Sequence, residues 1–198
     1  LDELRDFDPL FLENLDSEIF DNIVAVLGCD KSEIHNVYPL KQGLTNLSCH
    51  FSTNDGEWVY RHPGVGTELL IDRAAEKTAL ETARTLGLDN TFVFENPRRG
   101  WKISKFIPDC KNLDPKNDAQ LQKAMTMARQ LHESDATVER RFSFYDEGKG
   151  YERSLLARGP IDVTDWADME AQATELDKLL EAESSEPVLC HNDFFSLN

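Results

Sequence analysis

The chain has 198 residues, of which 40% are hydrophobic and 29% are charged. Its 21 Lys and Arg residues and 37 Asp and Glu residues leave a formal net charge of −16 at pH 7. No Lys- and Arg-rich run interrupts this acidic composition, so a phosphate backbone would be repelled and we expect no nucleic-acid partner. The length suits one domain, or two small lobes, with a sizeable buried core.

No apolar stretch approaches the roughly 20 residues of a membrane-spanning helix, so we expect no membrane insertion. The acidic N-terminus also lacks the basic and apolar regions of a signal peptide, which favours a cytoplasmic location. The cysteines are scattered without a CxxC or CxxxC pair, so the sequence predicts neither a zinc site nor a redox dithiol. Reduced, mostly buried thiols are the expected state of all four, Cys29, Cys49, Cys110 and Cys190.

The first predicted element is an amphipathic helix over residues 17–27, where apolar residues recur at helical spacing. Ser17 is its expected N-cap, and Gly28 is expected just past its end. Between residues 47 and 60, apolar and polar residues alternate up to an Asp-Gly pair and a β-rich segment follows. Alternation that leads into an Asp-Gly turn predicts a β-hairpin.

A second helix and a second hairpin follow. Helix-favouring residues from 69 to 86 carry a mild apolar stripe, and Gly87 is expected to end the helix. The hairpin arms are predicted at residues 91–94 and 101–107, joined by residues 95–100, which contain both Pro and Gly. We interpret this basic turn as an exposed connector.

After Pro108 the strand signals give way to helical ones. Asp118 is a candidate cap for a helix that extends to residue 131, and a further helix is predicted over residues 166–180. The next strand signal is a short apolar strand at residues 188–190. We therefore expect an α+β protein whose strand-rich and helical parts meet near residues 108–115.

The most informative motif is the C-terminal HNDFFSLN, in which His191, Asp193 and Asn198 have the spacing H-x-D-x-x-x-x-N of a kinase catalytic loop. Phosphoryl transfer to a hydroxyl needs a carboxylate that orients the nucleophile and accepts its proton, and an oxygen ligand for Mg²⁺. Asp193 and Asn198 carry those two groups. A polar turn after a strand is the structural alternative for this segment.

A second group of candidates lies in the strand-rich part. The turn QGLTNLS contains Gly43, Thr45 and Asn46 and could cover the phosphates of a nucleotide, although an ordinary hairpin turn would also explain it. Arg61 on the next strand is a candidate phosphate ligand, and Glu76 on the following helix could pair with Arg61. Each signal is weak alone, but their order along the chain is the order that a kinase requires.

At this point the sequence resembles the choline/ethanolamine kinase and aminoglycoside phosphotransferase superfamily, and most of all its bacterial choline kinases. The resemblance covers most of residues 37–198. It rests on five segments: QGLTNLSCHF, VYRHPGVGTELLIDRAAE, ISKFIPD, ARQLHES and LCHNDFFSLN.

The resemblance implies a two-lobed, protein-kinase-like fold, with a nucleotide-binding lobe at residues 1–108 and a partial helical lobe at 109–198 that ends at the catalytic loop. It also implies ATP and Mg²⁺ as cofactors. The implied nucleotide-binding residues are the loop Gly43, Leu44, Thr45 and Asn46, then Arg61 with its helix partner Glu76, and the hinge Lys105, Phe106 and Ile107.

The same resemblance implies a role for each residue of the catalytic loop. Asp193 would be the catalytic base and Asn198 a magnesium ligand, while His191 would brace the loop. His132 is assigned no catalytic role. The family also has an acidic metal ligand on a strand after this loop, so we expect the 198-residue chain itself to lack efficient catalysis.

The expected activity is ATP-dependent phosphorylation of the hydroxyl of choline, a small-molecule acceptor whose positive charge suits an acidic protein. Ethanolamine and aminoglycosides are alternative acceptors. A catalytically silent nucleotide-binding module is the alternative from another functional class.

Overall fold

The computed structural model describes residues 9–40, 47–64, 71–183 and 186–195. The loop residues Gly43–Asn46 and the metal candidate Asn198 therefore lie outside the described residues. By its contacts the chain forms two compact units, residues 1–132 together with 190–198, and residues 133–189. Within the described ranges, no helix is both long and apolar enough to cross a bilayer.

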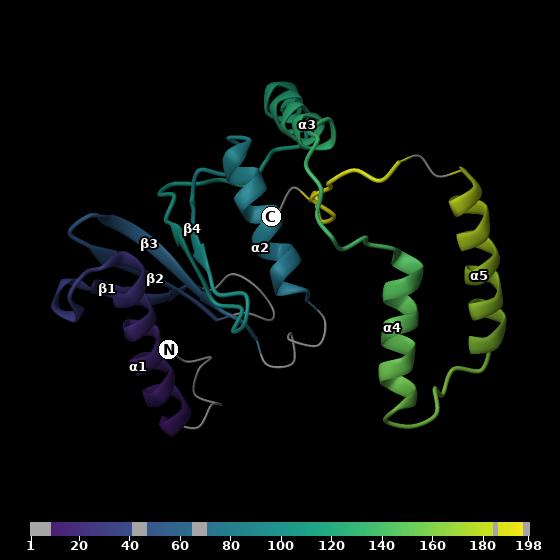
Figure 1. Cartoon of the computed structure of the whole chain (residues 1–198), viewed down its shortest axis with the longest axis horizontal. Helices are drawn as coiled ribbons and strands as arrows, with labels where there is room; N and C mark the ends of the chain where they lie inside the picture. The colour runs from purple at the N-terminus through teal and green to yellow at the C-terminus, as the bar shows by residue number, and fades with distance from the viewer. Residues whose placement is uncertain (1–8, 41–46, 65–70, 184–185, 196–198) are drawn as a thin grey trace. The chain divides into compact units, whose positions relative to one another are not determined.

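The first unit contains one antiparallel sheet of five strands in the order β1-β2-β3-β5-β4. Figure 1 shows this sheet with four of its strands labelled. The strands are β1 (His35–Leu40), β2 (Leu47–Thr53), β3 (Gly56–His62), β4 (Phe92–Glu95) and β5 (Lys102–Lys105). The helices of this unit are α1 (Pro9–Leu27), the short 3-10 helix η1 (Lys31–Glu33), α2 (Arg73–Thr85) and α3 (Asp118–His132).

Local sequence signals set several of these boundaries. The predicted β2–β3 hairpin is confirmed, but its two turn residues are Asn54 and Asp55, and Gly56 begins β3 opposite Thr53. Helix α2 begins at Arg73 because the Asp72 carboxylate accepts hydrogen bonds from the amides of Ala74 and Ala75, at 3.1 and 3.0 Å. Gly87 follows α2 with a φ of 71°, a left-handed conformation that suits glycine.

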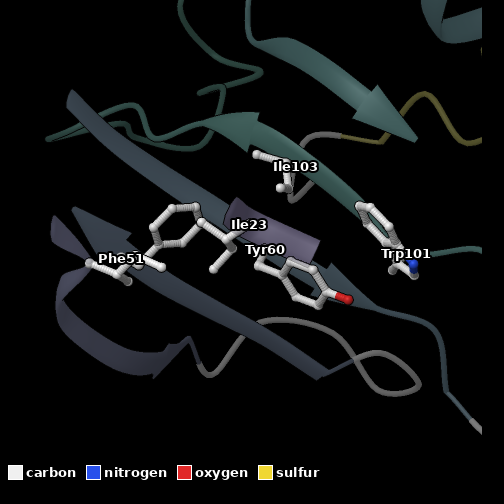
Figure 2. Close-up of a cluster of buried hydrophobic side chains, with 6 residues drawn as sticks. Ile23, Phe51, Tyr60, Trp101 and Ile103 are labelled. Carbon is white, nitrogen blue, oxygen red and sulfur yellow. The ribbon is translucent and has the colours of Figure 1, made fainter. Parts of the chain in front are cut away.

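Helix α1 packs on one face of the sheet and forms the main core with it. Ile23 of α1 is fully buried against Phe51, Tyr60 and Ile103 from β2, β3 and β5, as Figure 2 shows. Trp101 stacks on Tyr60 with ring centroids 5.7 Å apart. Asn22 Nδ2 donates a 2.9 Å hydrogen bond to Tyr60 Oη, and burial raises the pKa of this phenol, so it stays neutral.

Helix α2 lies on the opposite face of the sheet. Successive strand residues point to opposite faces, so Lys102 points away from the face on which its neighbour Ile103 packs against α1. Glu76 of α2 contacts Lys102, with 2.8 Å between Oε1 and Nζ. The sheet therefore separates an apolar core on the α1 side from a polar surface on the α2 side.

The β4–β5 turn does more than connect two strands, so our interpretation of it as a connector is incomplete. Arg99 Nη2 lies 2.8 Å from Glu18 Oε1 of α1. A Cβ atom on Gly100 would lie only 2.7 Å from Arg73 Nε, and the φ of Gly100 is 73°. The left-handed backbone conformation favours glycine here, and the turn contacts side chains from both α1 and α2.

The second unit is built from α4 (Phe144–Leu156) and α5 (Trp166–Glu183). Tyr145 Oη and Thr174 Oγ1 share a hydrogen bond of 2.9 Å, and Trp166 Nε1 donates to Glu152 Oε1 at 2.9 Å. Lys149 forms ion pairs with both Glu152 and Glu170. Polar contacts thus link the two helices along their length.

The predicted α+β class is confirmed, whereas several local predictions are wrong. Helix α1 begins at Pro9, a favourable first helical residue, so Ser17 is not its N-cap. Asn117 rather than Asp118 caps α3, because its Oδ1 accepts from the amide of Gln120 at 3.2 Å. Residues 188–190 form no strand in the structure, since an apolar segment becomes a strand only by pairing with another.

Helix α4 was missed by the sequence analysis. Its glycines, Gly148 and Gly150, lower helix propensity and obscure the periodicity. The signal that could have revealed it is Ser143, whose side chain accepts from the amide of Asp146. The contacts divide the chain after His132 and not near residue 108, and the division into lobes at 108 stays a prediction.

The core predicts a clear contrast between two isoleucine truncations. Ile103→Ala removes a fully buried side chain and should lower the free energy of unfolding by about 2–5 kcal/mol, because it leaves a cavity. Ile107→Ala, at a residue that is 53% exposed, should change it by less than about 0.5 kcal/mol. Urea unfolding followed by tryptophan fluorescence would measure both, and equal losses would contradict the placement of this core.

Candidate functional site

A row of polar residues crosses the α2 face of the sheet. The strand register places Ser48, Arg61, Lys102 and Glu95 side by side on β2, β3, β5 and β4. We call these four residues the polar row. Because directly opposed residues have Cβ atoms about 5 Å apart, the Arg61 and Lys102 side chains begin next to each other.

Glu76 of α2 is the anion that contacts this row. Its Oε1 lies 2.8 Å from Lys102 Nζ, and its Oε2 lies 2.7 Å from Arg73 Nη1. Burial alone would raise the pKa of Glu76, but hydrogen bonds and charge attraction from Lys102 and Arg73 outweigh it and lower the pKa to about 2. Glu76 is therefore ionised at neutral pH and holds two cations.

The expected pairing of Glu76 with Arg61 is wrong in this structure. Glu76 binds Lys102 from the neighbouring strand β5, and Arg73 from its own helix takes the second carboxylate oxygen. Among the residues that the structure describes, the Arg61 side chain has no hydrogen bond or ion pair. Because both carboxylate oxygens of Glu76 already contact Lys102 and Arg73, the Arg61 side chain is available to bind an anionic ligand.

Glu95 completes the polar row as a buried carboxyl group directly opposite Lys102 in the register. When the Glu95 side chain is ionised, neither of its oxygens accepts a hydrogen bond from any of the described residues. Burial and the negative charge of Glu76 raise its pKa to about 7, and its protonated form can donate a hydrogen bond to Glu76. Near neutral pH a large part of Glu95 is uncharged, so it neutralises the row only in part.

An aromatic group lies beside the polar row on the same face. The register places Tyr38, His50 and Val59 side by side on β1, β2 and β3. The Tyr38 and His50 rings stack at 4.4 Å, and Phe106 packs edge-on against His50 at 4.7 Å. His50 is buried, and its Nδ1 donates to the carbonyl oxygen of Asn36 at 3.0 Å. These ring contacts connect strand β1, through Tyr38 and His50, to Phe106 of the predicted hinge.

The hinge residues Lys105, Phe106 and Ile107 follow directly from strand β5. The Lys105 amide donates to the carbonyl of Thr91 at 2.8 Å, and the Phe106 amide donates to that of Glu57 at 2.9 Å. The Ile107 amide has no such partner among the described residues. Of the three hinge amides, the one of Ile107 can therefore donate to a ligand without breaking the sheet.

The predicted catalytic loop is described up to Phe195. His191 and Phe194 are in edge-to-face contact with centroids 6.0 Å apart, and the Phe195 amide donates to the Asp193 carbonyl at 3.0 Å. Asn192 has a φ of 63°, which asparagine tolerates better than most residues. The Asp193 side chain is exposed. These contacts form a tight turn, and the catalytic role of Asp193 stays a prediction.

The predicted phosphate loop, residues 43–46, and the predicted magnesium ligand Asn198 lie outside the described residues. Within the described part of the chain, no group of three or more His, Cys, Asp or Glu side chains is arranged to hold a metal ion. The Mg²⁺ assignment thus rests on the spacing of Asp193 and Asn198 alone.

Sequence reasoning missed two residues of the site, Lys102 and Glu95. Both are charged residues in a hairpin whose other members include Phe92, Trp101 and Ile103. A charged residue that alternates with apolar ones in a strand normally faces solvent, so the pattern alone gives no functional signal. The available clue was that both charges sit next to the turn, at register positions that face each other.

Glu95 predicts an unusual pH dependence of stability. Its folded-state pKa of about 7 lies above the ordinary 4.5, so its contribution is complete below about pH 4.5 and is lost as the pH rises to about 7. Glu95→Gln mimics the neutral acid and should remove this loss. At about pH 8 the variant should have the higher free energy of unfolding, by up to about 3 kcal/mol.

Urea unfolding at about pH 4.5 and about pH 8 would test this expectation, with Glu81→Gln on the exposed face of α2 as the matched control. The Glu81 side chain is 49% exposed and 3.7 Å from Lys77, so its variant should follow the wild type at both pH values. If Glu95→Gln is less stable than the wild type at about pH 8, the Glu95 carboxylate is not an unfavourable buried charge that lacks a hydrogen-bond donor.

Comparison with known proteins supports this arrangement at the level of the fold. No protein-family model and no curated protein sequence matches the chain. Solved structures do match. The choline kinase LicA from Streptococcus pneumoniae is 24% identical with a TM-score of 0.72, and the match covers 92% of this chain and 63% of LicA.

Two further structures extend the comparison. LicA in complex with AMP is 25% identical over 88% of this chain and 60% of that one, with a TM-score of 0.72. An ethanolamine kinase from Plasmodium vivax is 18% identical over 88% of this chain and 55% of that one, with a TM-score of 0.65. The chain thus spans less than two thirds of the length of these kinases.

The neighbours also include a spectinomycin phosphotransferase, at a TM-score of 0.52. The resemblance inferred from the sequence motifs is therefore confirmed for the fold. The chain has the protein-kinase-like α+β fold of the choline/ethanolamine kinase and aminoglycoside phosphotransferase superfamily.

Proposed function

We propose that the protein is part of an ATP-dependent phosphotransferase that phosphorylates the hydroxyl group of a small alcohol, with choline as the first candidate. The observation that carries the proposal is the cation cluster around Glu76. Arg61, Arg73 and Lys102 lie on or against one sheet face, and that sheet continues into the hinge at Ile107. In this fold such a surface is suited to a nucleoside triphosphate.

The nucleotide would be held by groups that have distinct tasks. The amide of Ile107, which has no hydrogen-bond partner in the described part of the chain, would donate to the adenine ring, and Val59 would offer the ring an apolar surface. Residues 43–46 would cover the phosphates. Arg61, which has no ion-pair partner among the described residues, would bind the phosphate oxygens and offset the charge that develops during transfer.

The acceptor alcohol would be activated by Asp193. An exposed carboxylate in a tight turn can accept a hydrogen bond from the hydroxyl, orient its oxygen toward the terminal phosphate and take its proton. Asn198 would contribute an oxygen ligand to Mg²⁺, which supplies charge neutralisation at the phosphates. His191 would brace the turn through its contact with Phe194.

Choline is the preferred acceptor for two reasons. The most similar structures described above are those of a choline kinase, and the net charge of −16 suits a cationic acceptor. Ethanolamine and an aminoglycoside are the alternatives within the same chemistry, in keeping with the other structural neighbours. We further propose a cytoplasmic location, a nucleotide-binding lobe at residues 1–108 and a helical lobe at 109–198.

The hinge assignment can be tested by removing one backbone donor. Ile107→Pro deletes the amide hydrogen and should weaken ATP binding about tenfold, the equivalent of one hydrogen bond of about 1.4 kcal/mol. Ile107→Ala keeps the amide and is the matched control, with expected affinity close to wild type. Calorimetric titration of the 198-residue chain would measure both, and equal affinities would remove the Ile107 amide from nucleotide recognition.

The reaction itself can be tested on the longest native protein that contains these 198 residues, because we expect the 198-residue chain alone to lack efficient catalysis. The assay uses ATP, Mg²⁺ and a panel of choline, ethanolamine and kanamycin. Asp193→Asn should lower the rate of phosphate transfer by at least about a hundredfold while ATP affinity stays within about twofold, because the base acts on the acceptor. Asp162→Asn replaces another exposed aspartate and should leave the rate unchanged.

Three outcomes of this assay separate the alternatives. Transfer to choline that Asp193→Asn abolishes supports the proposal, and faster transfer to another acceptor reassigns the substrate. ATP binding without transfer to any acceptor supports the silent nucleotide-binding module. Equal rates for wild type and Asp193→Asn would exclude Asp193 as the catalytic base.

A further inference from the structure

The position of Lys102 beside Arg61 needs a physical explanation. The two residues face each other on adjacent strands, and like charges in directly opposed positions repel. The Lys102 side chain is also only 15% exposed, so water screens its charge poorly. Such an arrangement is favourable only if enough negative charge lies nearby.

The described residues supply too little negative charge. Arg61 and Lys102 bring two positive charges to adjacent strands, and Lys102 shares the single negative charge of Glu76 with Arg73. Glu95 is opposite Lys102, but burial and the charge of Glu76 raise its pKa to about 7, so it contributes only part of a negative charge near neutral pH. The described cluster therefore keeps an excess of positive charge on a partly buried surface.

An anionic ligand with several oxygens would balance this excess. Lys102 and Arg61 leave neighbouring strands side by side, so two oxygens of one polyphosphate could contact both cations at once. Glu76 would act as the fixed counter-charge that orients Lys102, because its short contact limits where the ammonium group can lie. Glu95, neutral for much of the time, would leave Lys102 free to serve a ligand.

We propose that Lys102 is a second phosphate-binding cation, which Glu76 orients beside Arg61, and that the pair binds the phosphate groups of a nucleoside triphosphate. This inference rests on the proposed function, and it adds a residue from strand β5 to the nucleotide site. The competing explanation is that Lys102 only anchors helix α2 to the sheet.

The two explanations differ in how ligands with and without phosphates respond to Lys102→Met. A phosphate-binding Lys102 predicts that the affinity for ATP falls between about tenfold and a hundredfold, while the affinity for adenosine stays within about twofold. An anchoring role predicts equal changes for the two ligands. Lys102→Arg keeps the charge and should retain most of the ATP affinity.

Lys77→Met is the matched control. Lys77 lies on α2, and its ammonium group is 3.7 Å from Glu81, so the variant also removes one lysine and one ion pair from this helix. It should leave the affinity for both ligands unchanged. If circular dichroism shows that Lys102→Met does not fold, the double variant Lys102→Met with Glu76→Gln removes both charges of the pair and carries the same expectation for adenosine and ATP.

Calorimetric titration of the 198-residue chain and its variants with ATP and with adenosine decides between the outcomes. Selective loss of ATP affinity in the Lys102 variant confirms the assignment. Two outcomes would overturn the assignment of Lys102 but keep the proposed function. In the first, Lys102→Met binds ATP as tightly as the wild type does. In the second, Lys102→Met loses affinity for ATP and for adenosine to the same extent. Failure of the wild type to bind either ligand overturns both.

Discussion

The ion pairs of Glu76 are the constraint on which the polar face of the sheet depends. They join α2 to strand β5 through Lys102 and hold Arg73 against the turn at Gly100. Burying a charge is costly unless it is paired, and leaving one member of a buried pair alone costs about 3–5 kcal/mol. The network therefore fixes the approach of α2 to the sheet and, with it, the distribution of charge next to Arg61.

Alternation along the strands separates this charged face from the core. Tyr60 and Ile103 pack against α1, while their neighbours Arg61 and Lys102 point to the other side. A shift of one residue in the β3–β5 register would exchange the two faces and place charge in the core. The apolar core on one side thus enforces the register that aligns the cations on the other. In this way packing that is remote from any ligand determines the geometry of the candidate site.

Much of the fold could be predicted from local signals, because those signals act over a few residues. The segment Asn54-Asp55-Gly56 specifies a hairpin, with Asn54 and Asp55 in the turn, and Asp72 caps α2 by itself. Local signals failed where the deciding partner is distant or the propensity is weak. Residues 188–190 resemble a strand in sequence but form none in the structure, and the glycines of α4 hide a helix that its contacts with α5 stabilise.

The sequence by itself determined the order of the chemical groups: a glycine turn, Arg61, Glu76 and then Asp193 in its loop. That order is why the kinase-like fold could be inferred from it. Only the tertiary structure decided which cation Glu76 binds. Strand order places β5 next to β3, so Lys102, distant from Glu76 in sequence, reaches the carboxylate that we expected Arg61 to occupy. Ion pairs form between groups that long-range packing brings within a few ångströms, and sequence spacing does not encode that distance.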